Sequence, residues 1–356
     1  GWDTWKEFYV NDAGNQVHKF AMSIYARCMQ LTVGEENYPF PEEGYHGDDI
    51  RELARGFLAQ AGEFPGQTSQ DAWETAMAEY GLSVNIPRMK ADLKKYGIEY
   101  DQWFLESELH NSGYVEETVQ LLTDKGWTYE KDGALWLNTT QLLKEKFMRE
   151  GKSQEQVDKL DLKDDVLCRA NGFYTYFAAD IAYHRNKLEV RGFDKAINIW
   201  GADHHGHVAR MKGAMDAIGL NGEDLDVVLM QMVNLMRDGQ PVRMSKRTGN
   251  AITLTDLLEE VPIDSARFLF NMHDAGSGID FDLDQAVKTD NDNPVYYVQY
   301  AHARICSILK KMESEGVQFA GAEKVDATLL TEPSEMDLIR MLAAFPQEIV
   351  MAAEKY

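Results

Sequence analysis

A lysine-centred segment, residues 241–250, carries side chains suited to phosphate chemistry. It reads PVRMSKRTGN, with Met244, Ser245 and Lys246 at its centre. The ammonium of Lys246 can place a positive charge beside a developing polyphosphate, and the Ser245 hydroxyl can donate a hydrogen bond. The Thr-Gly-Asn that follows favours a turn before a helix that we expect to begin near Thr253. The segment therefore predicts a loop that binds a triphosphate.

A second group of polar residues follows an apolar run at 195–201, which predicts a buried strand. Gly201, Asp203, His204 and His207 stand where this strand meets a predicted helix. Such a junction offers backbone N–H groups and a helix dipole to a nucleotide, and Asp203 can hold ribose hydroxyls. Three alternatives stay open: a capped helix with surface histidines, a zinc site, and a small nucleotidyltransferase that uses His204 to His207 as a His-x-Gly-His motif.

Tyr176 and Asp180 lie four residues apart in a segment of helical character, so their side chains share one face. A carboxylate beside an aromatic ring can receive a guanidinium through bidentate hydrogen bonds and stacking. A Tyr/Asp pair on a helix is usually a solvated face. The position of this pair just before the strand at 195–201 favours a binding role instead.

Composition restricts the class of protein. The chain has 356 residues, of which 44% are hydrophobic and 11% aromatic, and this suits an enzyme with two or three domains. A net charge of −23 opposes non-specific nucleic-acid binding, so any such role must rest on motifs. Cys28, Cys168 and Cys306 are far apart, and neither a long apolar run nor a signal-peptide pattern is present. We therefore expect a cytoplasmic protein without disulfides or membrane segments.

Hydrophobic periodicity predicts the elements that position these residues. Short strands are expected at 7–10 and in a hairpin at 127–137 with an Asp-Gly turn. A β–α–β unit is expected from a strand at 195–201, a helix at 207–218 and a strand at 226–233. Ligands bind such units at the carboxyl ends of the strands.

Five segments resemble motifs of the bacterial-type arginyl-tRNA synthetases, which are class I aminoacyl-tRNA synthetases, and they occur in the same order as in that family. The segments are YVNDAGNQ (9–16), YFAADIAYH (176–184), IWGADHHGH (199–207), VRMSKRTG (242–249) and NPVYYVQYAHAR (293–304). The resemblance implies an α/β fold with a Rossmann-like parallel-sheet catalytic core, a connective insertion and an all-α anticodon-binding domain. The expected boundaries are 1–31 and 166–289 for the core, 32–165 for the insertion and 290–356 for the helical domain.

The resemblance also implies roles for the motif residues. Tyr176 and Asp180 match the pair that binds the substrate arginine side chain, and His204 matches a further substrate contact. The positions that match ATP-binding residues are Gly201, Asp203, His207, Met244 and Lys246. The expected catalytic residues are Lys246, which steadies the departing pyrophosphate, and Ser245. The residues expected to line the active site are Asn11, Asp12 and Gln16.

The implied activity is ATP-dependent activation of L-arginine to arginyl-adenylate, followed by transfer of arginine to the 3′ end of tRNA(Arg). The substrates would be L-arginine, tRNA(Arg) and ATP with Mg2+, without a metal bound by the protein itself. The arginine carboxylate attacks the α-phosphorus, so the protein contributes positioning and charge stabilisation instead of a nucleophile. A buried carboxylate at Asp180 would discriminate against citrulline and lysine.

The chain also departs from the family pattern. Arg243 stands where the lysine loop has its first lysine. The family's own His-x-Gly-His motif precedes the segment that opens this chain, so His204 to His207 do not take its role. The N-terminal module and the closing helices of the family find no match either. We therefore expect an interior part of a longer enzyme that is nearly inactive alone, and a non-catalytic binding module is the alternative.

Overall fold

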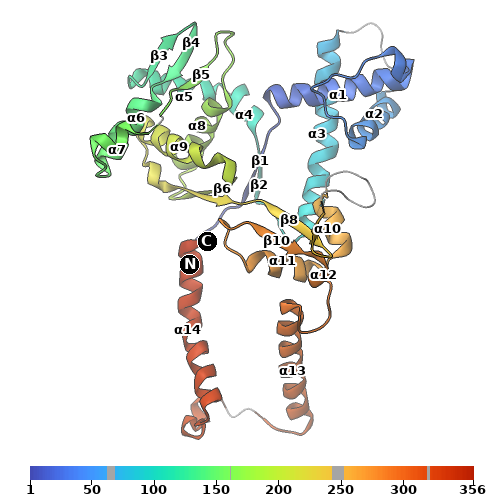
Figure 1. Ribbon diagram of the computed structural model, residues 1–356, viewed down its shortest axis with the longest axis vertical. Coiled ribbons are helices and arrows are strands. Elements are labelled where there is room, and N and C mark those ends of the chain that lie inside the picture. The colour runs from blue at the N-terminus through green and yellow to red at the C-terminus, as the bar shows by residue number, and fades with distance from the viewer. Residues whose placement is uncertain (62–68, 161, 243–251, 319–320) are drawn as a thin grey trace. The chain divides into compact units, whose positions relative to one another are not determined.

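The computed structural model describes residues 1–61, 69–160, 162–242, 252–318 and 321–356. The chain divides into two compact units, Gly1–Val295 and Tyr296–Tyr356. All described strands belong to the first unit, whereas the second is helical (Figure 1). Within the described residues, no helix is both long and apolar enough to cross a membrane.

Two parallel strand pairs carry the residues of interest in the first unit. β1 (Glu7–Val10) pairs with β2 (Gln102–Leu105). β6 (Ala196–Gly201) pairs with β7 (Leu225–Met230), and α9 (His205–Ile218) connects them. Because paired parallel strands end on the same edge, residues that follow β1 and β2 lie together, and so do residues that follow β6 and β7. The predicted β–α–β unit is confirmed.

The predicted strand at 226–233 is divided in the structure. β7 ends at Met230, and the backbone N–H of Gln231 donates to the carbonyl of Ala275 at 3.0 Å. The prediction of a single strand was wrong because the apolar run continues while the hydrogen-bond partner changes. The next residues belong to a three-stranded sheet of β10 (Ile279–Asp282), β8 (Val233–Arg237) and β9 (Gln240–Pro241).

The predicted hairpin is present as β3 (Thr128–Lys131) and β4 (Ala134–Leu137). Its turn residues Asp132 and Gly133 have φ angles of 53° and 75°, the left-handed conformation that tight hairpin turns require. β5 (Asp165–Cys168) adds an antiparallel third strand beside β4. The sequence therefore predicted both the strands and their turn.

The helices of the first unit pack around three apolar clusters. One cluster lies among α1 (Gly14–Val33), α2 (Asp48–Ala61) and α3 (Gln70–Lys95). A larger one involves the parallel strands, α9, α4 (Glu106–Asn111), α5 (Tyr114–Asp124), α6 (Thr139–Arg149) and α8 (Tyr176–Arg185). The third involves α10 (Leu254–Glu260), α11 (Ile263–Asn271) and α12 (Leu283–Ala286). Shorter elements are α7 (Gln154–Asp158), the π-helical turn η2 (Asn186–Val190) and the 3-10 turns η1 (Glu35–Asn37), η3 (Ala202–His204), η4 (Gly222–Asp224), η5 (Ala322–Lys324) and η6 (Ala327–Leu329).

α8 lies inside the larger cluster and positions part of the site. Phe177, Ala179, Ile181 and His184 are buried and point to different sides of the helix, which is typical of a helix enclosed by protein. The helix begins at a defined point because the Thr175 side chain accepts the N–H of Ala178. Side chains on α8 therefore have little freedom to move.

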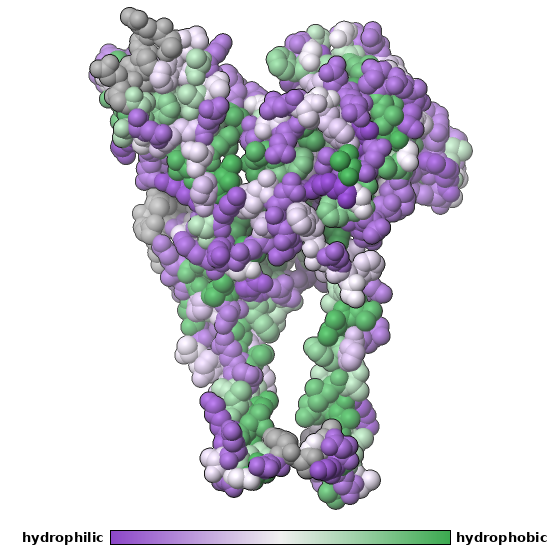
Figure 2. Space-filling view, turned by 180° about the vertical axis from the view of Figure 1, so that it is seen from behind, coloured by the Kyte–Doolittle hydropathy of each residue, from purple (hydrophilic) through white to green (hydrophobic). Residues whose placement is uncertain are grey.

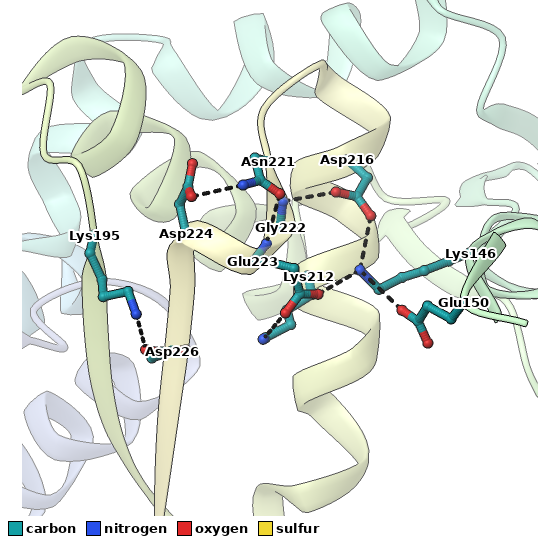
Figure 3. Close-up of polar contacts among 10 residues, drawn as sticks. All are labelled: Lys146, Glu150, Lys195, Lys212, Asp216, Asn221, Gly222, Glu223, Asp224 and Asp226. Carbon is teal, nitrogen blue, oxygen red and sulfur yellow. Dashed lines mark hydrogen bonds and ion pairs between the residues drawn. The ribbon is translucent and has the colours of Figure 1, made fainter. Parts of the chain in front are cut away.

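A cluster of ion pairs around Lys146 joins α6 to α9 (Figure 3). The Lys146 ammonium lies 2.9 Å from Glu223 and 3.1 Å from Asp216, and Glu150 is a third carboxylate partner at 3.6 Å. Asp216 also accepts the backbone N–H of Gly222 at 2.8 Å. Any side chain at Gly222 would collide with the backbone of α9, so the turn into β7 requires glycine.

The second unit consists mainly of two long helices, as predicted for the end of the chain. They are α13 (Pro294–Ser314), whose first residues belong to the first unit, and α14 (Pro333–Lys355). Both expose apolar side chains, such as Ile308 on α13 and Phe345 on α14, and Figure 2 shows hydrophobic residues along each helix. Apolar stripes of this kind are typical of helices that pack against a partner.

Candidate active site

The lysine-centred segment lies mostly outside the described residues. Met244, Ser245 and Lys246 all belong to residues 243–251, of which the structure gives no description. The described chain resumes just before α10, where the Thr253 hydroxyl accepts the N–H of Asp256 at 3.1 Å. The helix therefore begins where the sequence predicts, and the roles of the three loop residues stay predictions.

Tyr176 and Asp180 lie on α8 at its accessible side. Tyr176 is 46% exposed, and the Asp180 side chain is 35% exposed. The Asp180 carboxylate lies 3.4 Å from Nε2 of His207 on α9. The His207 ring also packs edge-on against Phe177, with ring centroids 5.1 Å apart. The structure thus brings a residue expected to bind ATP into contact with one expected to bind arginine.

The segment between β1 and α1 reaches the same place. A Cβ atom at Gly14 would lie 3.6 Å from the Tyr176 hydroxyl, so the backbone of this segment packs against the Tyr176 ring. Gly14 has a φ of 78°, which favours glycine at this contact. Asn11 and Gln16 flank it and are exposed. The lining role of Asn11 and Gln16 stays a prediction.

Asp12 holds the start of α4. Its carboxylate accepts the backbone N–H of Ser107 at 2.8 Å and the Ser107 hydroxyl at 2.6 Å. An acidic side chain is favourable at a helix N-terminus because it satisfies free N–H groups and the helix dipole. The parallel pairing of β1 with β2 brings these residues together, since each lies just beyond its strand. Asp12 therefore has a structural contact that its sequence neighbours do not reveal.

Glu106 is a buried carboxylate that the sequence analysis missed. It begins α4 directly after β2 and is only 2% exposed. Burial raises its pKa to about 7, and the negative charges of Asp180 and Asp12 add to the effect. Its Oε2 has no hydrogen-bond partner among the described residues, and its Oε1 lies 3.6 Å from His110. An acidic residue directly after the apolar run QWFL was the available signal.

Tyr9, on β1, completes this acidic region. Burial strongly raises the pKa of Tyr9, and the charges of Glu106 and Asp180 raise it further. Its phenol therefore stays protonated and can donate a hydrogen bond. The ring lies against that of Tyr183, with centroids 4.4 Å apart. Carboxylates and aromatic rings from β1, α4 and α8 thus surround one region of the first unit.

The residues after β6 form an open, polar turn. Asp203 and His204 lie in η3, where their side chains are 82% and 59% exposed and 3.7 Å apart. A Cβ atom at Gly201 would lie 2.5 Å from Oδ1 of Asp203, so glycine leaves room at the strand end. The Trp200 ring joins this turn to α9, because its centroid lies 5.4 Å from that of His207. The turn meets the N-terminus of α9, a favourable place for a phosphate.

The zinc alternative finds no support in the described part of the chain. No group of three or more His, Cys, Asp or Glu side chains there is placed to hold a metal ion. His207 contacts Asp180 and also Arg210, whose Nη2 lies 3.2 Å from its Nδ1. His204 faces Asp203 instead.

The fold is mixed α/β, and its first unit gathers the carboxylates of Asp12, Glu106 and Asp180 near the ends of parallel strands. Two family models match the chain: class I (R) tRNA synthetase catalytic domain over residues 84–293, and DALR anticodon binding domain over residues 298–356. The chain belongs to the class I (R) tRNA synthetases. The family resemblance and the predicted fold class are therefore confirmed.

Relatives with known names agree. The arginine–tRNA ligases of Ruminiclostridium cellulolyticum and Caldanaerobacter subterraneus are 51% and 53% identical over 99% of this chain and 60% of their own length. The structure of a Campylobacter jejuni protein assigned as an arginyl-tRNA synthetase is 34% identical, with a TM-score of 0.73 over 86% of this chain and 62% of that one. The chain spans about 60% of the length of the curated relatives it matches.

Proposed function

We propose that this chain carries the arginine-binding and ATP-binding sites of an arginine–tRNA ligase. The observation that carries this proposal is the negative charge gathered around Asp180, where Glu106 is buried with an oxygen that lacks a partner among the described residues. A guanidinium would supply both the missing N–H donors and the opposite charge. The names of the relatives and the family model support the same substrate.

The pocket suits a guanidinium better than other side chains of similar length. Asp180 can accept two parallel N–H bonds, and the rings of Tyr176 and Tyr9 can face the planar cation. Lysine offers a compact ammonium without this fork, and citrulline offers no charge. Either compound would leave the two carboxylates incompletely paired, and this is costly above all for Glu106, which is buried. We assign His204, Asn11, Asp12 and Gln16 to the rim of the same pocket.

The proposed reaction has two steps. In the first, a carboxylate oxygen of arginine forms a bond to the α-phosphorus of ATP, and the bond from that phosphorus to pyrophosphate breaks. In the second, a hydroxyl at the 3′ end of tRNA(Arg) attacks the arginyl carbonyl, and AMP leaves. The protein holds the reactants in place and stabilises the charge that develops on pyrophosphate.

The nucleotide side of the site would be divided between two segments. Gly201, Asp203 and His207 would bind the adenosine, and Met244, Ser245 and Lys246 would meet the phosphates. We propose that Mg2+ arrives bound to the phosphates of the ATP substrate. The protein would act in the cytoplasm, where its tRNA partner is found.

Calorimetric titration of L-arginine, with citrulline as the uncharged isostere, tests the proposal. We expect arginine to bind the chain at least about a hundredfold more tightly than citrulline, and Asp180→Asn to abolish the difference. Asp203→Asn is the matched control, because its carboxylate is exposed and belongs to the nucleotide turn; it should leave arginine binding unchanged. Equal affinities for arginine and citrulline in the wild type would contradict the proposal.

A further inference from the structure

A chain of hydrogen bonds runs from a lysine on η2 to the backbone of Asp180. Nζ of Lys187 lies 2.8 Å from Oδ1 of Asn198 on β6. Nδ2 of Asn198 lies 2.7 Å from Nε2 of His184, and Nδ1 of His184 lies 2.6 Å from the carbonyl oxygen of Asp180. His184 is 2% exposed and Asn198 is 8% exposed. Lys187 is half-buried, so the three side chains form a largely buried relay that ends at the backbone of Asp180.

The Asp180 carbonyl sets the direction of the bonds in this relay. A carbonyl oxygen can only accept, so the His184 ring proton sits on Nδ1, and Nε2 accepts from the NH2 group of Asn198. Oδ1 of Asn198 then accepts from Lys187. Burial lowers the pKa of His184 to about 3, which keeps the ring neutral, as the relay requires.

The surroundings of Lys187 do not balance its charge. Among the described residues it forms no ion pair with a carboxylate, and its ammonium instead lies 4.0 Å from the centre of the Tyr183 ring. The nearby Glu7 carboxylate is held by Arg191 and by the Tyr183 hydroxyl. Burial lowers the pKa of Lys187 to about 7 although Glu7 and Asp180 favour the charged form. A half-buried lysine without a carboxylate partner among the described residues adds little to the stability of the fold, so its place in the relay points to a role in the site.

We propose that Lys187 is a positioning residue of the amino-acid site, which acts through Asn198 and His184 to hold the Asp180 segment of α8 in place. The relay crosses from η2 to β6 and back to α8, so it fixes Asp180 relative to the strand that ends at Gly201. The arginine pocket and the nucleotide turn are thereby held in register. Lys187 itself touches no substrate. A π-helical turn at such a place agrees with the frequent use of these turns near functional sites.

The decisive experiment compares Lys187→Met with Lys146→Met, which removes a buried lysine with a defined set of partners (Figure 3). The protonation of the His184 ring across pH is read from 15N–1H correlations of histidine-labelled protein, and arginine affinity from calorimetry. We expect the wild type to carry one ring proton, on Nδ1. Lys187→Met should raise the pKa of His184, because the positive charge of Lys187 lowers it, and should weaken arginine binding by about tenfold. Lys146→Met should change neither.

Asn198→Asp provides a second test with Lys187 intact. A carboxylate can only accept, so it would draw a second proton onto the His184 ring at Nε2, while Nδ1 keeps its proton for the Asp180 carbonyl. We expect a raised pKa of His184 and weaker arginine binding in this variant too. An unchanged protonation profile of His184 in both variants would overturn the relay, and unchanged arginine affinity would overturn its positioning role.

The inference rests on the proposed function only for its affinity readout. Absence of arginine binding in the folded wild type would contradict the proposed function, whereas the protonation profile of His184 would still test the relay. Equal losses of affinity in Lys187→Met and Lys146→Met would assign the effect to general stability and overturn the positioning role.

Discussion

Two lysines of the first unit, Lys146 and Lys187, have opposite electrostatic surroundings. Burial opposes the charge of Lys146, but hydrogen bonds to Glu223 and Asp216 outweigh it and raise its pKa above the ordinary value. Lys187 donates to one neutral amide, and burial lowers its pKa to about 7. The difference shows that charges are matched where α6 holds α9 and left unmatched where the proposed arginine site lies.

Glu106 follows the same rule as Lys187. It is a buried carboxylate near the proposed substrate site, with one oxygen unpartnered among the described residues and a raised pKa. Unmatched charges lower stability, but they give a site groups that only a ligand can satisfy. Charged residues thus stabilise the fold around Lys146, whereas Glu106 and Lys187 serve the proposed arginine site.

The largest expected effect is the loss of stability in Lys146→Met. This change leaves Asp216 without its cation, whereas Glu223 keeps Lys212 at 2.7 Å. We expect the free energy of unfolding to fall by about 3 kcal/mol, the low end for a broken buried pair, because Glu223 also reaches solvent. Urea denaturation measures it. Lys187→Met is the matched comparison and should cost less than about 1 kcal/mol. Equal losses of unfolding free energy in the two variants would contradict the difference between the two lysines.

The pH dependence of stability should separate the same two lysines. The pKa of Lys187 is about 7 in the folded protein against 10.5 ordinarily, so the unfolded chain binds more protons between these values. Stability should therefore rise with pH across this window, by at most about 1.4 kcal/mol per pH unit. Lys146 has a raised pKa, so its contribution is fully present throughout the window and is lost only above it.

Urea denaturation of the wild type and both methionine variants, from pH 7.5 to 9.5, tests this difference. The contribution of Lys187 is the wild-type slope minus the slope of Lys187→Met, since other groups titrate equally in both. Lys146→Met should keep the wild-type slope. If the free energy of unfolding of Lys187→Met rises with pH as steeply as that of the wild type, burial does not destabilise the ammonium of Lys187. This holds together with the contributions of Glu7, Asp180 and Arg191 to its pKa.

A smaller effect is expected in arginine binding at Glu106. Its pKa of about 7 means that arginine must displace a proton from the carboxyl at lower pH. Arginine affinity should therefore increase between pH 5.5 and 7, by at most about tenfold per unit, and level off above. Calorimetry on Glu106→Gln should give lower affinity at pH 8 and a flatter profile. Parallel profiles in the two proteins would assign the titration to another group.

The smallest effect is expected for the ion pair between Lys195 and Asp226, which Figure 3 draws together with the ion pairs of Lys146. Their charged atoms lie 2.6 Å apart, but the side chains are 48% and 30% exposed. Lys195→Ala should change the free energy of unfolding by less than about 1 kcal/mol, because water and salt screen such pairs. A loss as large as that of Lys146→Met, measured in the same urea series, would show that burial does not separate the two sites.

Much of the local structure follows from residues that are close in the sequence. The hairpin turn at Asp132, the cap at Thr253 and the β–α–β unit depend on neighbouring residues and on periodicity, so they were predictable. The shared face of Tyr176 and Asp180 follows from helical spacing in the same way. The family could also be predicted, because the order of motifs along the chain can be read from the sequence alone.

The sequence missed contacts that depend on strand pairing. β2 went unrecognised, because four residues at the end of a long helical stretch form too short a run to stand out. Without β2, nothing indicated that Glu106 lies near Asp180 or that Asp12 holds α4. The break between β7 and β8 was missed for a similar reason, since the apolar run is continuous while its partner strand changes.

The sequence by itself determined the order of the motifs, the family and the helical face that carries Tyr176 and Asp180. Only the tertiary structure decided that His207 touches Asp180, that Glu106 is buried beside them, and that Lys187 reaches Asp180 through two side chains. The physical reason is that charge state and hydrogen-bond direction depend on burial and on partners far away in the chain. The spacing of residues within one helix or strand does not predict those partners.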